Sequence, residues 1–283
     1  MSPSPAPPYD HRMATASLNG VSVSYTDEGD RSAPVLLLIH GHPFDRSMWE
    51  PQLAAAVAAG RRVVAPDLRG YGGTSVVPGV TGFEAFAADL AALLDHLGVA
   101  SAVVGGLSMG GQIAMEFCRL HADRVQGLIL ADTFPRAETP EGKVFRNNLA
   151  DRLLKEGMDG YAAEVIDKMV APATIAARPE VAAHVLRMMR STSPEGAAAA
   201  LRGRAERPDY CELLSRTAVP AWVVVGSDDT YTPVSDAEFM HRQLPHSTLT
   251  VIEGAGHMPN LEYPAEFNAA LTAYLEGPAA STR

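Results

Sequence analysis

The chain has 283 residues, of which 47% are hydrophobic, and its formal net charge at pH 7 is −10. This length and apolar content are sufficient for one large domain with a buried core. This net negative charge disfavours nucleic acids and anionic membrane surfaces as partners, and the only basic cluster in the sequence is the short stretch at residues 202–207. No apolar run reaches the ~20 residues that span a bilayer, so we expect no membrane association.

The chain start and the cysteines predict a cytoplasmic protein. Residues 1–13 are rich in proline and lack the basic start and apolar centre of a secretion signal, so we expect a disordered leader there. Residues 277–283 are expected to form a disordered tail. The two cysteines, Cys118 and Cys211, are too few and too far apart for a disulfide framework or a metal site. A reducing compartment is therefore predicted.

Short apolar segments alternate with amphipathic ones along most of the chain. Residues 18–26 contain Asn19-Gly20 and predict an opening antiparallel hairpin. Residues 83–97 carry Phe and Leu at helical spacing and predict a helix over one face of a sheet. This alternation is typical of the α/β class, with a mostly parallel sheet covered on both faces. The central strands are predicted at residues 35–39, 62–65, 102–105, 127–131, 221–225 and 248–252.

Residues 136–216 interrupt that alternation. They contain helical patterns at 144–154, 161–169 and 181–189 but no convincing strand, and residues 197–200 are a plain alanine run. We therefore predict a core made of residues 14–135 and 217–276, with a helical cap at 136–216 inserted between two sheet strands. Ligands of open α/β sheets bind at the carboxyl ends of the strands, which such an insertion would cover.

The sequence Gly106-Leu107-Ser108-Met109-Gly110 follows one predicted strand and precedes a helical stretch. A serine at such a sharp turn has a strained backbone, and small flanking residues prevent collisions with the strand and the helix. The turn pushes the hydroxyl of Ser108 toward a substrate. We therefore predict that Ser108 is a nucleophile.

A serine nucleophile needs a base and an acid that orients the base. His257 is the predicted base, because Gly254-Ala255-Gly256-His257 follows the last strand and reaches the same edge of the sheet as Ser108. The acid has three candidates, each in or beside a loop after a strand. Asp229 is preferred, Asp132 comes next, and Asp228 is the neighbour of the preferred residue.

Acyl transfer also requires backbone donors aimed at the oxyanion. The N–H of Met109, at the start of the helix, is one predicted donor, and the N–H of His42 in His40-Gly41-His42-Pro43 is the other. His40 and His42 as metal ligands are the alternative, which the absence of a carboxylate or cysteine in register disfavours. We expect no metal and no organic cofactor.

Four separated motifs in this order resemble the α/β-hydrolase fold serine hydrolases, over about residues 16–275. They are His40-Gly41-His42-Pro43, Asp67-Leu68-Arg69-Gly70-Tyr71-Gly72, Gly106 to Gly110, and Gly256-His257. Residues 44–49, the Asp67 loop and residues 257–262 are most similar to the branch of 3-oxoadipate enol-lactonases and small carboxylesterases. The resemblance implies an α/β-hydrolase fold and hydrolysis of a small ester or lactone.

Related families differ at the sharp turn that carries Ser108. Haloalkane dehalogenases and epoxide hydrolases carry a carboxylate at the position of Ser108, so the serine argues against their chemistry in this chain. Carbon–carbon bond hydrolases often carry Asn where this chain has Leu107. We therefore predict a carboxylic-ester or lactone hydrolase that forms an acyl-enzyme on Ser108 and acts on a small molecule. A carbon–carbon hydrolase or lyase with the same triad, and a small-molecule receptor with incidental hydrolysis, stay open. The sequence does not indicate an oligomeric state.

Overall fold

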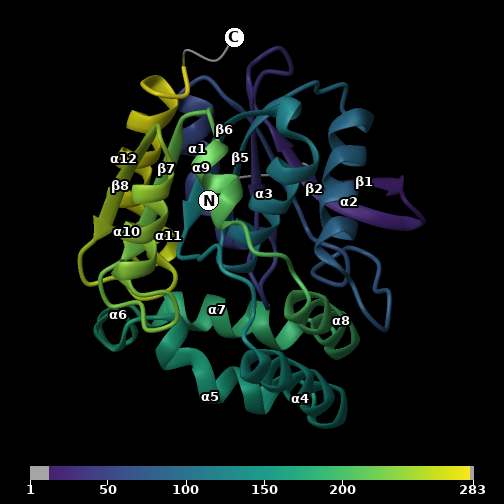
Figure 1. Ribbon diagram of the computed structural model, residues 1–283. Helices are drawn as coiled ribbons and strands as arrows, with labels where there is room; N and C mark the ends of the chain where they lie inside the picture. The colour runs from purple at the N-terminus through teal and green to yellow at the C-terminus, as the bar shows by residue number, and fades with distance from the viewer. Residues whose placement is uncertain (1–12, 281–283) are drawn as a thin grey trace, which may run out of the picture.

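The computed structural model describes residues 13–280 (Figure 1). Residues 1–12 and 281–283, on which most of the predicted leader and part of the predicted tail fall, lie outside the described residues. The strands are β1 (Met13–Leu18), β2 (Val21–Glu28), β3 (Val35–Ile39), β4 (Arg62–Pro66), β5 (Ala102–Leu107), β6 (Val125–Ala131), β7 (Ala221–Gly226) and β8 (Ser247–Ile252). The six predicted central strands are confirmed, and their ends differ from the prediction by at most two residues.

Helices lie between most of these strands. In chain order they are the 3-10 helix η1 (Arg46–Trp49), α1 (Glu50–Ala58), α2 (Phe83–His96), α3 (Met109–Leu120), the 3-10 helix η2 (Ala122–Arg124), α4 (Pro140–Glu156), α5 (Asp159–Met169), α6 (Pro172–Ala177), α7 (Pro179–Ser191), α8 (Pro194–Ala205), α9 (Cys211–Arg216), α10 (Val234–Gln243), α11 (Pro259–Glu262) and α12 (Pro264–Glu276). No helix between residues 13 and 280 has the length and apolar character needed to cross a bilayer.

The strands form one eight-stranded sheet in the order β1-β2-β4-β3-β5-β6-β7-β8. All neighbours are parallel from β4 to β8, whereas β1 pairs with β2 and β2 with β4 in antiparallel fashion. The predicted hairpin is confirmed around Asn19-Gly20, but it begins at Met13 rather than at residue 18. Most of β1 is exposed or half-buried, so it lacks the apolar alternation that marks a strand in a sequence.

Each face of the sheet has its own hydrophobic core, because successive strand residues point to opposite faces. Leu36 and Leu38 of β3 pack on the side of α1 and α12. Leu37 and Ile39 pack on the side of α2 and α3. Since all four side chains are buried, β3 is a continuous apolar run, as expected for a central parallel strand. The sheet is therefore a rigid platform whose loops carry polar groups.

The helices α4 to α9 leave the sheet after β6 and return at β7, and this segment contains no strand, as predicted. In Figure 1, α4, α5, α7 and α8 gather at the lower end of the molecule, beyond the sheet. Thr192 Oγ1 donates to Pro43 O at 3.0 Å, and Thr81 N donates to Ala199 O at 3.0 Å. The inserted helices thus pack on loops that follow the carboxyl ends of strands.

Three of the inserted helices, α6, α8 and α9, have no counterpart in the sequence-based prediction. Helix α8 contains the alanine run Ala197–Ala200, which is completely buried. Alanine favours helix formation but gives no amphipathic contrast, so a search for periodicity does not detect it. Helix α9 packs against α10, a helix that follows β7.

Candidate active site

Ser108 occupies the turn between β5 and α3 with φ 57° and ψ −117°, a conformation that is strained for any residue with a side chain. A Cβ at Gly106 would lie 2.2 Å from Gly110 O, and a Cβ at Gly110 would lie 2.2 Å from Ile39 O. Only glycine fits at these two positions. The Ser108 N–H donates to Ala131 O at 2.9 Å, which ties the turn to the next strand. The structure therefore has the sharp turn that the sequence predicts.

His257 and Asp229 form a close pair at the carboxyl edge of the sheet. His257 follows β8, Asp229 follows β7, and the distance from His257 Nδ1 to Asp229 Oδ2 is 2.7 Å. An ionised carboxylate only accepts hydrogen bonds, so Nδ1 carries a proton and Nε2 of the neutral ring keeps a free lone pair. That tautomer is the one a general base requires.

The environment of Asp229 favours its charged form. Its carboxylate accepts hydrogen bonds from the N–H of Tyr231 at 2.7 Å, the N–H of Thr232 at 3.2 Å, and the Thr232 hydroxyl. Burial would raise the pKa of Asp229, but the charge of His257 and these hydrogen bonds outweigh it, and the net direction is downward. Asp229 is therefore a buried, ionised carboxylate in contact with His257.

Asp132, the alternative acid, lies at the end of β6 with φ 43°. One of its oxygens accepts a hydrogen bond from Gly226 N at 2.9 Å. Burial and the nearby charge of Asp229 raise the pKa of Asp132 well above its ordinary value. Its surroundings therefore favour the protonated form of Asp132, whereas those of Asp229 favour the charged form.

Asp228, the third candidate, is exposed. Its N–H donates to Ala255 O at 2.8 Å, and its carboxylate accepts from the Ser227 hydroxyl at 2.8 Å. These are local loop contacts. The structure thus brings Asp229 and Asp132 to His257 and leaves Asp228 at the surface.

Ser108 Oγ forms no hydrogen bond to His257 within residues 13–280, and it is not fully enclosed. Hydrogen bonds between a nucleophile and its base are often long without substrate and shorten when the substrate binds. The order of the three side chains along the sheet edge follows from β5, β7 and β8, since the carboxyl ends of these parallel strands meet there.

The loop after β3 lies directly against Ser108. A Cβ on Gly41 would be 3.3 Å from Ser108 Cβ, which explains the glycine. Within the described part of the chain, the N–H groups of His42 and Met109 have no hydrogen-bond partner. Met109 begins α3, so its N–H also carries the positive end of the helix dipole. Two free donors are thus available beside the serine.

The side chains of His40 and His42 have separate partners. His40 Nε2 accepts from Leu68 N at 2.9 Å, and His40 Nδ1 lies 2.8 Å from Gly41 O, so both ring nitrogens are engaged. His42 Nδ1 lies 2.8 Å from the Tyr71 hydroxyl. Burial lowers the pKa of both histidines and keeps them neutral. His40 therefore braces the loop and is not free to bind a metal.

Two acidic residues that sequence reasoning left without a role hold the loops. Glu262 is completely buried, and its carboxylate accepts from the N–H groups of Gly256 at 3.0 Å, Met258 at 3.2 Å and Ala171 at 2.9 Å. It thereby fixes the backbone on both sides of His257 and joins it to the inserted helices. Glu262 is the last residue of the sequence motif 257–262, and this position is the signal that could have identified it.

Asp67 has the corresponding role in the loop after β4. Its carboxylate accepts from Arg46 N at 2.9 Å and Gly73 N at 2.8 Å, and it forms an ion pair with the Arg46 side chain. The side chain is almost completely buried. These contacts join the loops after β3 and β4, and so support the segment that contains His42.

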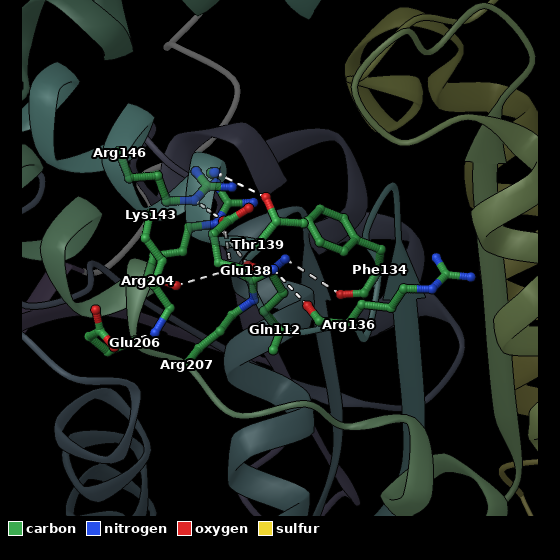
Figure 2. A network of polar contacts seen from close by, with 12 residues as sticks. Gln112, Phe134, Arg136, Glu138, Thr139, Lys143, Arg146, Arg204, Glu206 and Arg207 are labelled. Carbon is green, nitrogen blue, oxygen red and sulfur yellow. Dashed lines mark hydrogen bonds and ion pairs between the residues drawn. The ribbon is translucent and has the colours of Figure 1, made fainter.

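A polar network joins α3 to the inserted helices (Figure 2). Arg204 of α8 donates from Nε to Gln112 Oε1 at 2.8 Å, and Gln112 Nε2 donates to Phe134 O at 3.4 Å. Arg146 and Arg207 both pair with Glu138. The basic stretch 202–207 contains Arg204, whose partner Gln112 is 92 residues away in the chain, so no local sequence pattern indicates this contact.

The family described as "Alpha/beta hydrolase family" matches residues 36–270. A 3-oxoadipate enol-lactonase of Acinetobacter baylyi is 29% identical over 269 residues, which cover 95% of this chain and 98% of the relative.

Solved structures give the same result. An esterase from Thermogutta terrifontis, solved with malate bound, is 40% identical with a TM-score of 0.89, and the match covers 93% of this chain and 98% of the other. The enol-lactonase from Burkholderia xenovorans is 28% identical with a TM-score of 0.86, over 93% of this chain and 99% of the other.

Proposed function

The chain belongs to the alpha/beta hydrolase family, and from this premise we propose that it cleaves small carboxylic esters or lactones through an acyl-enzyme on Ser108. Enol-lactonases and esterases are among its relatives over nearly the full chain length, so the enzyme is a carboxylic-ester hydrolase. The geometry of the site supports the further assignment of a role to each residue.

The observation that carries the mechanism is the buried pair of His257 and Asp229, with 2.7 Å between Nδ1 and Oδ2. A charged carboxylate held by three further hydrogen bonds can stabilise an imidazolium without being protonated itself. Asp132 accepts one hydrogen bond, and its surroundings favour the protonated form, so it is less suited to this role. We therefore assign the acid role to Asp229 and the base role to His257.

In the first half of the proposed reaction, Ser108 Oγ attacks the ester carbonyl carbon while His257 Nε2 takes the hydroxyl proton. The carbonyl oxygen becomes an oxyanion that accepts from the N–H groups of His42 and Met109. His257 then donates its proton to the departing alcohol oxygen. For a lactone this oxygen stays attached, so the ring opens and one product forms.

In the second half, His257 takes a proton from water, and the resulting hydroxide attacks the acyl carbon on Ser108. The same two N–H groups stabilise the second oxyanion. The bond to Ser108 Oγ breaks, the serine recovers its proton from His257, and the carboxylic acid leaves. The inserted helices between residues 136 and 216 act in this proposal as a cap that limits the size of the substrate.

The proposal is tested by trapping the intermediate. The protein is mixed with para-nitrophenyl acetate, quenched in acid during turnover, and digested for mass spectrometry. We expect one acetyl group on the peptide that contains Ser108, and none in Ser108→Ala. Steady turnover of a panel of aryl esters and lactones is also expected. A single burst without turnover contradicts the enzyme proposal in favour of a receptor, and cleavage of vinylogous ketones alone indicates a carbon–carbon hydrolase.

A further inference from the structure

Arg204 is a buried cation whose charge is not balanced by a carboxylate. Its relative exposure is 8%, and it forms no ion pair within 4.0 Å among residues 13–280. Its only side-chain hydrogen bond in this range runs from Nε to Gln112 Oε1. The two terminal nitrogens, Nη1 and Nη2, are neither hydrogen-bonded nor fully enclosed. They therefore keep some contact with solvent while the rest of the side chain is buried.

The surrounding charges make this cation more unusual. Arg146 and Arg207 share the single carboxylate of Glu138, so three guanidinium groups face one counter-charge (Figure 2). Glu206, on the same segment, is already paired with Lys143. Burial and the charges of Arg146 and Arg207 lower the pKa of Arg204, and the opposing effect of Glu138 does not outweigh them. Such a local excess of positive charge is unexpected in a chain of net charge −10.

The position of Arg204 relates it to the proposed reaction. Its partner Gln112 is completely buried one helical turn after the nucleophile, and Gln112 N donates to Ser108 O at 3.2 Å. The charge of Arg204 also reaches the proposed oxyanion loop, where it is the largest charge effect on the pKa of His42. Arg204 is thus linked through Gln112 to the helix that begins directly after Ser108.

Helix α8 holds Arg204 rigidly. A Cβ on Gly196 would lie 2.0 Å from Gly70 O, and a Cβ on Gly203 would lie 1.7 Å from Thr81 O, so the helix touches the core backbone at both ends. The hydrogen bond from Thr81 N to Ala199 O lies between these two contacts. A guanidinium on such a support loses little freedom when it binds a ligand.

We propose that Arg204, oriented by Gln112, forms an anion subsite that binds a carboxylate carried by the ester or lactone substrate. The two free terminal nitrogens match the planar, bidentate geometry of a carboxylate. A substrate without a negative charge leaves the buried guanidinium unpaired, so the subsite discriminates against neutral esters. This inference rests on the proposed function and narrows its substrate class to esters of dicarboxylic or other acid-bearing compounds.

The test uses two esters of the same shape. Mono-para-nitrophenyl glutarate carries a terminal carboxylate, and the corresponding glutaramate carries a neutral carboxamide instead. The wild-type enzyme is expected to have a kcat/KM about 10 to 100 times higher for the glutarate ester, as one hydrogen-bonded charge pair provides. In Arg204→Met this ratio is expected to fall to one or below, and Arg204→Lys is expected to restore part of it.

Two further variants separate the subsite from a structural role. Gln112→Glu places a carboxylate against Arg204 and is expected to remove the preference while the arginine stays in place. Arg202→Met is the matched control, since Arg202 lies on the same helix and pairs with Asp151 at the surface. It is expected to keep the wild-type ratio. Circular dichroism and thermal unfolding show which variants are folded.

The outcomes distinguish failure of the subsite from failure of the proposed function. A wild-type ratio of one, or an unchanged ratio in both Arg204→Met and Gln112→Glu, overturns the subsite while ester hydrolysis stands. If the wild type hydrolyses neither ester, the proposed function fails. The subsite is then decided by calorimetric binding of both esters to Ser108→Ala. A higher Kd for the glutarate ester in the double variant Ser108→Ala, Arg204→Met than in Ser108→Ala supports the subsite, and an unchanged Kd overturns it.

Discussion

The loops at the carboxyl edge of the sheet and the inserted helices hold polar groups in different ways. At the sheet edge, backbone N–H groups hold the carboxylates, as Tyr231 and Thr232 do for Asp229 and as three N–H groups do for Glu262. In the inserted segment, the side chains of Arg146 and Arg207 pair with Glu138, and Arg204 has no ion pair within the described part of the chain.

This difference indicates a division of tasks. Groups held by the backbone keep one geometry, which bond-making chemistry requires. A side-chain network with excess positive charge is instead completed by a ligand. We therefore expect substitutions at the sheet edge to change kcat, and substitutions among the arginines to change stability and substrate choice.

The largest effect is expected for Ser108→Ala. Loss of the nucleophile lowers kcat for ester hydrolysis by about 10⁴- to 10⁶-fold. Because the hydroxyl of Ser108 has no partner among the described residues, the thermal unfolding midpoint should not decrease. Stopped-flow and steady-state assays with an aryl ester measure the rate. A folded variant that keeps a tenth of the wild-type rate rules out Ser108 as the nucleophile.

The two neighbouring carboxylates provide the next comparison. Asp229→Asn is expected to lower kcat by about 10⁴-fold, because an amide leaves His257 in the wrong tautomer and does not stabilise its charged form. Asp132→Asn should cost far less, since Asp132 is already neutral and the amide oxygen can still accept from Gly226 N. If Asp132→Asn is the crippled variant, the acid follows β6 and our assignment is wrong.

In the inserted helices the main effect is expected on stability. Among residues 13–280, Glu138 is the only carboxylate that pairs with Arg146 and Arg207, so Glu138→Gln removes the partner of two guanidinium groups. We expect the free energy of unfolding to fall by about 1–3 kcal/mol, as measured by urea denaturation at neutral pH. Glu141→Gln, on the exposed start of α4, is the control and should have no effect. Equal stability of both variants contradicts the proposed charge imbalance.

Asp132 also predicts a pH dependence of stability. Its pKa is raised by folding, so the stabilisation it contributes is complete below its unfolded pKa of ~3.9 and is lost as the pH rises toward the folded value. The free energy of unfolding of Asp132→Asn, relative to the wild type, should therefore increase between about pH 4 and pH 7. Asp228→Asn removes the same charge from an exposed site and should give a flat difference. Parallel profiles for both variants count against a neutral Asp132.

The smallest effect is expected from metal removal. Dialysis against a strong chelator should leave kcat/KM unchanged, because no step of the proposed reaction uses a metal ion and both ring nitrogens of His40 are engaged. A loss of activity that zinc restores contradicts this. It would direct attention to Asp132, Asp229 and His257, whose ligand atoms lie within 4.8 Å of one another.

Local signals predicted much of the fold and the centre of the site. The central strands are runs of apolar residues, and the elbow around Ser108 needs glycine at 106 and 110 because the backbone of Gly110 and Ile39 is so close. These requirements act over a few residues. His257 could be placed because it follows the last strand, and all parallel strands end at one edge.

The sequence by itself thus determined the six central strands, the sharp turn at Ser108 and the place of His257 after the last strand. The tertiary structure decided which carboxylate contacts His257 and is surrounded by hydrogen-bond donors, since Asp229 has three further donors and Asp132 has one. It also decided that Arg204 is buried against Gln112 without an anion. Burial and charge balance depend on contacts between residues far apart in the chain, and no local pattern encodes them.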